Sequence, residues 1–248
     1  LLRAWRDARV DVEVLRPDLS AVRALAVPRF PSPGVYLRLL APELLPLGVE
    51  RALYLDSDIV VLGDLGRLWD TDLGEHPLAA IQDQSIPFLD SERALPDVDA
   101  LRGLLWSVRG VANWEELGLD PRGPYLNSGV LLMDIDTWRR EGSAGRLLEC
   151  LREQRAHAGM PDQYVLNVVF AGRWLPLDMR WNASPGLLAH HAPERSPFDA
   201  ETLDRVRGGP WIIHYVGALK PWTWDGRVGW REAFRAELAE TPWPAWAR

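Results

Sequence analysis

The sequence predicts an α/β fold, because short runs of β-branched and apolar residues alternate along the chain with segments of helical periodicity. Hydrophobic residues make up 47% of the 248 residues, which is enough to form the core of one large domain. The formal net charge is −7, and the chain has no long run of like charge. This pattern argues against a nucleic-acid partner and favours a bound cation.

Strands and helices are expected in a regular order up to residue 83. Strands are assigned from apolar runs bounded by polar residues, and helices from apolar residues three or four positions apart. The expected elements are a strand over residues 10–15, a helix over 35–45, a strand over 52–62, a short helix over 65–73 and a strand over 78–83.

The alternation is interrupted by a polar stretch over residues 84–124 and resumes with a buried strand over 129–135. A helix should begin near Thr137, with Asp136 as its N-cap. Further along the chain we expect a strand over 211–213, a proline-rich surface loop over 184–197 and a closing helix within 230–248.

Cysteine usage indicates the compartment. Cys150, in a segment of helical pattern, is the only cysteine, so neither an intramolecular disulfide nor a cysteine-rich zinc site can form. No apolar run is long enough to span a bilayer, and the first residues do not resemble a secretory signal. We expect a cytoplasmic location, at most peripheral at the inner face of the membrane.

The sharpest local motif is the pair Asp56 and Asp58, which ends an apolar run. At the carboxyl end of a strand in an open α/β sheet, carboxylates two residues apart can face one ligand. They repel each other unless a cation or a proton lies between them. Oxygen ligands suit Mg²⁺, Mn²⁺ or Ca²⁺, and an added imidazole would favour Mn²⁺. The alternative is a solvated turn.

His214 follows a second apolar run and is a candidate for the third metal ligand. Gly217 would let the backbone approach a ligand closely, and Lys220 is a compact charge suited to a phosphate oxygen. Of the 28 Lys and Arg side chains in the chain, Lys220 is the only lysine. The alternatives are a hydrogen-bonded core histidine and a lysine retained by chance.

Five ordered segments between about residues 10 and 222 resemble glycosyltransferase family 8, which includes relatives of glycogenin and lipopolysaccharide galactosyltransferases. The segments are YLDSD, LWDTDLG, YLNSGVLLMDIDTWR, PDQYVLN and HYVGALKPW. The resemblance implies a Rossmann-like mixed sheet of the GT-A type that binds Mn²⁺, with Mg²⁺ as a substitute. It also implies retaining transfer of galactose or glucose from a UDP-sugar to a carbohydrate or glycolipid acceptor.

The same resemblance assigns roles to residues. The implied metal ligands are Asp56, Asp58 and His214, and the implied donor contacts are Arg38, Ser57, Asp83, Asn127, Ser128, Gly217 and Lys220. Asp162 and Gln163 match the pair beside the anomeric carbon. Because an amide is a poor nucleophile, front-face attack with Gln163 as a positioning group is at least as plausible as a covalent intermediate. The alternative for Asp162 is a helix N-cap.

The resemblance also suggests the domain organisation. We expect a catalytic domain over residues 1–224 that lacks the family's first strand and uracil-binding loop, followed by a helical tail over 225–248. The mixed charge of that tail argues against membrane association. Two other hypotheses stay open at this point: a haloacid dehalogenase-type phosphatase, and a relative that binds nucleotide-sugars without catalysis.

Overall fold

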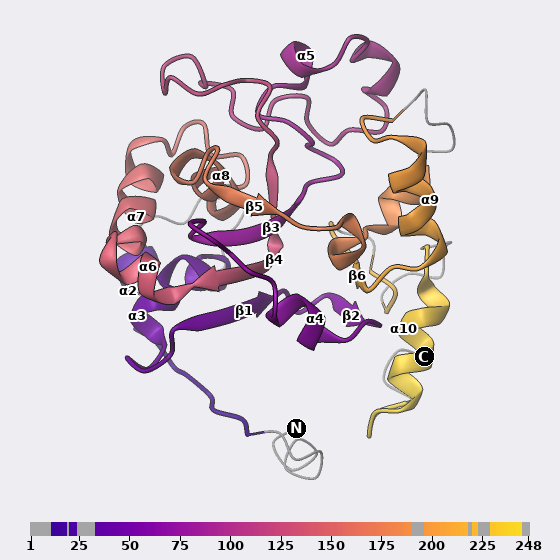
Figure 1. Cartoon of the computed structure of the whole chain (residues 1–248), viewed down its shortest axis with the longest axis horizontal. Helices are drawn as coiled ribbons and strands as arrows, with labels where there is room; N and C mark the ends of the chain where they lie inside the picture. The colour runs from indigo at the N-terminus through magenta and orange to yellow at the C-terminus, as the bar shows by residue number, and fades with distance from the viewer. Residues whose placement is uncertain are drawn as a thin grey trace.

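The computed structural model describes residues 11–18, 20–23, 33–189, 196–217, 220–222 and 229–244. Its centre is a four-stranded sheet with the strand order β1-β4-β3-β5 (Figure 1). The strands are β1 (Arg51–Leu55), β3 (Leu78–Gln82), β4 (Leu126–Asp134) and β5 (Trp174–Pro176). Both β1 and β3 are antiparallel to β4, whereas β5 is parallel to β3. The predicted α/β class with a mixed sheet is therefore confirmed.

A second, two-stranded sheet lies beside the first and consists of β2 (Ile59–Val61) and β6 (Ile212–His214). The single strand predicted over residues 52–62 is therefore wrong, because the chain changes sheets within it. The backbone N–H of Asp56 still donates to Gly129 in β4, whereas the carbonyl of Asp58 already accepts from Tyr215 after β6. The Asp-Ser-Asp motif is the turn between the two sheets.

Helices cover the sheets on both sides (Figure 1). On one side, α6, α7 and α8 bury Trp138, Tyr164 and Phe170 against the large sheet. On the other side, α9 packs near the small sheet, and Phe234 of α10 packs against β2 and Tyr215. The α-helices are α2 (Ser20–Arg23), α3 (Ala41–Leu44), α4 (Leu65–Trp69), α5 (Ser91–Ala94), α6 (Ile135–Arg140), α7 (Ser143–Glu153), α8 (Pro161–Val169), α9 (Ala200–Gly208) and α10 (Arg231–Ala239).

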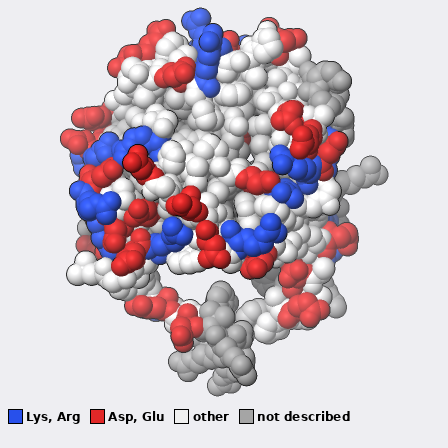
Figure 2. All heavy atoms as spheres, viewed as in Figure 1, with Lys and Arg blue, Asp and Glu red and all other residues white. Residues whose placement is uncertain are grey.

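Short 3-10 helices complete the structure at Pro33–Leu40, Asp99–Leu101, Met179–Asn182 and Pro185–Ala189. The helix predicted over 35–45 is thus a 3-10 helix that continues into α3. In the part of the chain that the structure describes, no helix combines the length and the apolar character needed to cross a membrane. Basic and acidic side chains are interspersed on the face shown in Figure 2.

Two further sequence-based expectations about local structure are wrong, and so is one of the alternatives. Residues 11–15 form no strand and are exposed, because no described segment pairs with them and a lone strand leaves its backbone groups unpaired. The N-cap of α6 is Asp134 rather than Asp136, and its side chain accepts from the N–H of Thr137. The N-cap of α8 is Met160, so Asp162 lies inside the first turn. Part of the loop predicted over 184–197 and the end of the tail lie outside the described residues.

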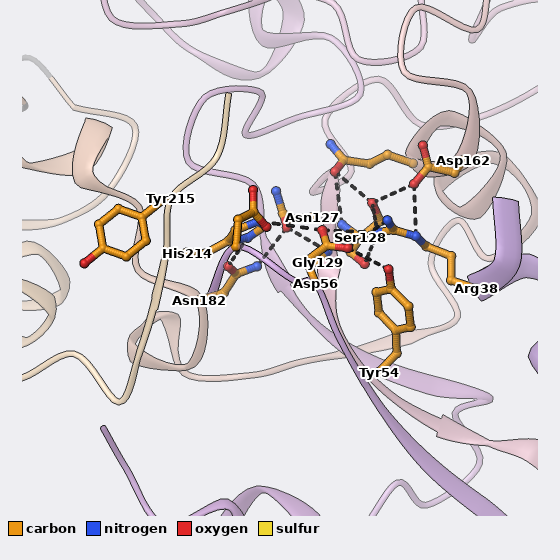
Figure 3. A network of polar contacts seen from close by, with 12 residues as sticks. Arg38, Tyr54, Asp56, Asn127, Ser128, Gly129, Asp162, Asn182, His214 and Tyr215 are labelled. Carbon is orange, nitrogen blue, oxygen red and sulfur yellow. Dashed lines mark hydrogen bonds and ion pairs between the residues drawn. The ribbon is translucent and has the colours of Figure 1, made fainter. Parts of the chain in front are cut away.

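The pairing of β3 with β4 contains a register shift beside the candidate site. Ala80 pairs with Leu131, but the next residue, Ile81, pairs with Asn127, so the register shifts between them. Such a bulge re-aims side chains and is common beside active sites. Here it lies next to Asn127 and Ser128, whose side chains join the polar network in Figure 3.

Candidate active site between the two sheets

A cavity of about 1110 Å³ opens where β1, β3 and β6 end and β4 begins. It brings together residues from segments far apart in the sequence. All twelve residues that the sequence pointed to line this cavity: Arg38, Asp56, Ser57, Asp58, Asp83, Asn127, Ser128, Asp162, Gln163, His214, Gly217 and Lys220.

Three of these side chains form a candidate metal site at the junction of the sheets. Each of Asp56, Asp58 and His214 offers one ligand atom, and these atoms all lie within 4.8 Å of one another. The Nε2 atom of His214 is 3.2 Å from Asp58 Oδ1 and 3.6 Å from Asp56 Oδ2. Two carboxylates and an imidazole suit a divalent cation such as Mn²⁺ or Mg²⁺, so the residues present fit the metal that the sequence predicts.

The orientation of His214 is fixed by a chain of hydrogen bonds that starts at the backbone. The N–H of Gly129 donates to Asn127 Oδ1 at 2.9 Å, and Asn182 Nδ2 donates to the same oxygen at 2.9 Å. Asn182 Oδ1 must then accept from the Nδ1–H of His214, 2.9 Å away. This tautomer leaves the Nε2 lone pair directed at the carboxylates, as a metal ligand requires.

On the side of the cavity next to the large sheet, Arg38 contacts Asp56, Asp162 and Ser128 (Figure 3). Its Nη2 donates to Asp56 Oδ1 at 2.8 Å, and its Nε is 3.2 Å from Asp162 Oδ2. Its Nη1 donates to both the carbonyl oxygen and the Oγ of Ser128 at 2.6 and 2.9 Å. Burial lowers the pKa of Arg38, but Asp162 and Asp56 outweigh it and the net shift is upward. The guanidinium therefore stays charged.

Asp162 is buried, and this desolvation raises the pKa of its carboxyl although Arg38 opposes the shift. Its Oδ2 also accepts from Ser128 Oγ at 3.1 Å. Both contacts hold the side chain in one position at the start of α8, beside Gln163. Asp162 is thus a paired group rather than an N-cap.

Asp83 and Gln163 form a second network. Asp83 Oδ2 accepts from Asn127 Nδ2 at 2.8 Å and from Gln163 Nε2 at 3.1 Å. The amide oxygen of Gln163 accepts from the backbone N–H of Ser128 at 3.0 Å. Each side of the Gln163 amide therefore has a partner, and its orientation is fixed.

The segment after β6 supplies the remaining predicted residues. Lys220 Nζ forms an ion pair with Asp58 Oδ2 and donates to the carbonyl of Tyr215 at 2.5 Å. Burial raises the pKa of Asp58, but a protonated His214 and Lys220 outweigh it, so without a metal that pKa lies well below its usual value. A bound metal would replace the proton on His214 Nε2. Gly217 is exposed with φ +79°, a backbone conformation that favours glycine, and Ser57 is exposed in the turn between the sheets.

Sequence reasoning missed three residues that shape the site. The hydroxyl of Tyr54 donates to Asp56 Oδ1 at 2.6 Å, and burial raises its pKa so that it keeps its proton. A Cβ atom on Gly129 would lie 2.2 Å from His214 Cε1 and 2.9 Å from Asp56 Oδ2, so only glycine fits. Tyr54 and Gly129 lie within the quoted motifs, but nothing near Asn182 in the sequence marks it as a partner of His214.

Comparison with known proteins identifies the family. The sequence model of glycosyl transferase family 8 matches residues 11–226. Because this match covers most of the chain, the chain belongs to glycosyltransferase family 8. The predicted resemblance is confirmed, and membership in this family removes the phosphatase hypothesis.

Individual relatives agree with this assignment. The chain is 31% identical to glycosyltransferase GlyF of Streptococcus pneumoniae over 75% of its own length and 37% of that protein. It is 25% identical to the lipopolysaccharide 1,2-glucosyltransferase of Escherichia coli over 94% of its own length and 62% of that protein. The chain therefore spans less than two thirds of the length of both relatives.

A solved structure confirms the fold. The galactosyltransferase LgtC, crystallised with donor and acceptor sugar analogs, superposes with a TM-score of 0.68 at 27% sequence identity. The similarity covers 91% of this chain and 73% of the LgtC chain. The expected GT-A type of mixed α/β fold is thus confirmed.

Proposed function

We propose that this protein is a retaining hexosyltransferase that moves galactose or glucose from a UDP-sugar to a carbohydrate or glycolipid acceptor with Mn²⁺. The observation that carries the proposal is the cluster of Asp56, Asp58 and His214 in the cavity, with His214 turned so that Nε2 faces both carboxylates. Mn²⁺ is favoured over Mg²⁺ because the candidate ligands include an imidazole besides the two carboxylates, and Mg²⁺ is bound mainly by oxygen ligands. The known activities of the glucosyltransferase and galactosyltransferase relatives support a hexose donor.

A divalent metal held by Asp56, Asp58 and His214 would supply Lewis-acid stabilisation of the charge that develops on the departing diphosphate. Lys220 lies next to the cluster and would provide a cation for the same phosphate oxygens. The exposed backbone at Gly217 and the exposed hydroxyl of Ser57 offer further contacts to the donor. The protein thus contributes positive charge at the place where the leaving group departs.

The opposite wall of the cavity would orient the sugar. The Asp83 carboxylate already accepts from Asn127 and Gln163, and in the proposed complex it also accepts from sugar hydroxyls. The amide oxygen of Gln163 is engaged by the N–H of Ser128. That bond reduces its availability as a nucleophile, which supports a positioning role and front-face attack by the acceptor. Arg38 keeps Asp162 and Asp56 in place.

Calorimetric titration of UDP into the purified chain, with and without Mn²⁺, tests the proposal. We expect binding only with the metal, and we expect Asp58→Asn to abolish it because one ligand oxygen is lost. Slow hydrolysis of UDP-glucose or UDP-galactose should follow in the wild type. A folded protein that does not bind UDP with Mn²⁺ would contradict the proposal, and UDP binding without any donor turnover would indicate a non-catalytic relative.

A further inference from the structure

We propose that Trp106 is the platform of an acceptor subsite, and that this subsite binds an uncharged saccharide. The inference rests on the proposed function, because it concerns the second substrate of the same cavity. Three features of the described residues carry it: the exposure of the Trp106 ring, the anchoring of its backbone beside Asp83, and the distribution of charge over the cavity wall.

Exposure singles out Trp106. The large hydrophobic side chains that the structure shows as exposed are Val12, Val14, Leu15, Leu47, Leu62, Trp69, Trp106 and Trp243. Among these residues Trp106 alone lines the cavity, and the residue is 49% exposed. A tryptophan left in water loses the benefit of burial, so an exposed tryptophan that lines a cavity indicates a contact surface. A pyranose presents an apolar C–H face that suits an aromatic ring.

The Trp106 backbone is tied to the proposed donor-sugar contact. Its N–H donates to the carbonyl of Ser85 at 2.9 Å. Ser85 in turn donates its own N–H and its Oγ to Asp83 Oδ1 at 2.8 and 2.9 Å. The other oxygen of Asp83 holds Gln163. The backbone of Trp106 is therefore joined by hydrogen bonds to the residue that we propose contacts the donor sugar, so the proposed acceptor subsite adjoins the proposed donor-sugar subsite.

The stretch that carries Trp106 is anchored at several backbone positions. The N–H of Ser91 donates to the carbonyl of Val108 at 2.7 Å. The N–H groups of Gly110 and Val111 both donate to the carbonyl of Leu89 at 3.0 Å. An aromatic side chain has few rotatable bonds, so it adds contact area at a small entropic cost when its backbone is fixed.

The distribution of charge on the cavity wall favours an uncharged acceptor. The charged lining residues in the described part of the chain are Arg38, Asp56, Asp58, Asp83, Asp162 and Lys220. Each of them already has an ion pair or hydrogen bonds within the proposed donor and metal network. Val35, Met160, Val216 and Trp222, which line the cavity besides Trp106, are uncharged. Among the described lining residues, no cation is left outside that network to pair with a phosphate or carboxylate on the acceptor.

The size of the cavity is consistent with two substrates. Cavities for one small ligand usually measure roughly 300–1,000 Å³. The volume of about 1110 Å³ lies above that range. A nucleotide-sugar at the metal cluster therefore leaves room for a saccharide against Trp106.

Saturation-transfer NMR tests the inference in the presence of UDP and Mg²⁺, which avoids paramagnetic broadening. The probes are the methyl glycosides of glucose, galactose, mannose and N-acetylglucosamine, with methyl β-D-glucuronide as the charged probe. We expect transfer to at least one neutral glycoside and little transfer to the glucuronide. Trp106→Ala should weaken the neutral glycoside about two- to tenfold, whereas Trp106→Phe should retain most of the binding.

Trp243→Ala is the matched control, because Trp243 is also an exposed tryptophan, at 43%, but does not line the cavity. UDP binding is measured in parallel in every variant. The inference is overturned if the glucuronide binds as well as the neutral probes, if no neutral glycoside binds while UDP does, or if the two alanine variants behave alike. Failure of the wild type to bind UDP would instead contradict the proposed function itself.

Discussion

Asp56 and Asp58 are two residues apart, yet the structure supports them in different ways. Asp56 belongs to the large sheet, where Arg38 and the Tyr54 hydroxyl bind Oδ1 at 2.8 and 2.6 Å. Asp58 belongs to the small sheet and is paired with Lys220, the long flexible side chain of the segment after β6. The Asp56 carboxylate is thus held by a network around the buried Arg38, and the Asp58 carboxylate is paired with a single, partly exposed lysine.

The difference suggests a division of labour within the proposed metal site. The buried side defines where the cation binds, because Arg38 connects Asp56 to Asp162 and Ser128. The other side adapts when the donor arrives, because Lys220 can exchange the Asp58 carboxylate for a phosphate oxygen. Phe234 of α10 supports that segment through ring contacts with Tyr215 and Trp222, at centroid distances of 6.2 and 5.6 Å.

The largest expected effect comes from removing Arg38, the cation that holds Asp56 and Asp162. Arg38→Met would leave the buried Asp162 and the partly buried Asp56 without their cation, and removal of one partner from a buried ion pair costs about 3–5 kcal/mol. Lys220→Met should lower the free energy of unfolding by about 1 kcal/mol at most, since its pair is nearer the surface. Urea denaturation of both variants measures the difference. Equal losses of stability would show that the two carboxylates are supported alike.

A second prediction concerns Gly129, which leaves room for the side chains of His214 and Asp56. Gly129→Ala would place a Cβ atom 2.2 Å from His214 Cε1, so His214 and Asp56 must move apart. Overpacking of this kind costs about 1–3 kcal/mol, and we expect the loss of Mn²⁺-dependent UDP binding as well. Gly145→Ala in α7 is the matched control, because a Cβ atom at that position would meet no other atom within 4 Å. Calorimetry that finds both variants binding UDP like the wild type would contradict the prediction.

The smallest expected effect is a loosened metal ligand. Asn182→Ala would remove the partner of His214 Nδ1 and free the imidazole to rotate. Loss of such a partner typically lowers metal affinity about 10–100-fold. Titration of Mn²⁺ followed by electron paramagnetic resonance of the free ion measures this change in the absence of any donor. An unchanged affinity would mean that packing around the buried His214, rather than Asn182, sets its orientation.

The sequence by itself determined much of this site, because its motifs are local. Asp56 and Asp58 were found because they follow an apolar run, and Asn127 and Ser128 come directly before the buried strand predicted over 129–135. Those residues lie in or beside β1 and β4 and line one cavity. The α/β class followed from the alternation of strand-like apolar runs with segments of helical periodicity. Each pattern shows which face of its own segment is buried.

Only the tertiary structure decided how these local pieces meet. It divided the predicted strand over 52–62 between two sheets, since hydrogen-bond partners from distant segments compete for the backbone there. It left residues 11–15 without a strand neighbour among the residues that the structure describes, although their alternating pattern is typical of a strand. It also brought Asn182 to His214 and Trp106 to the cavity wall. Side-chain periodicity records which face is buried but not which distant residue covers it, so these contacts required the folded chain.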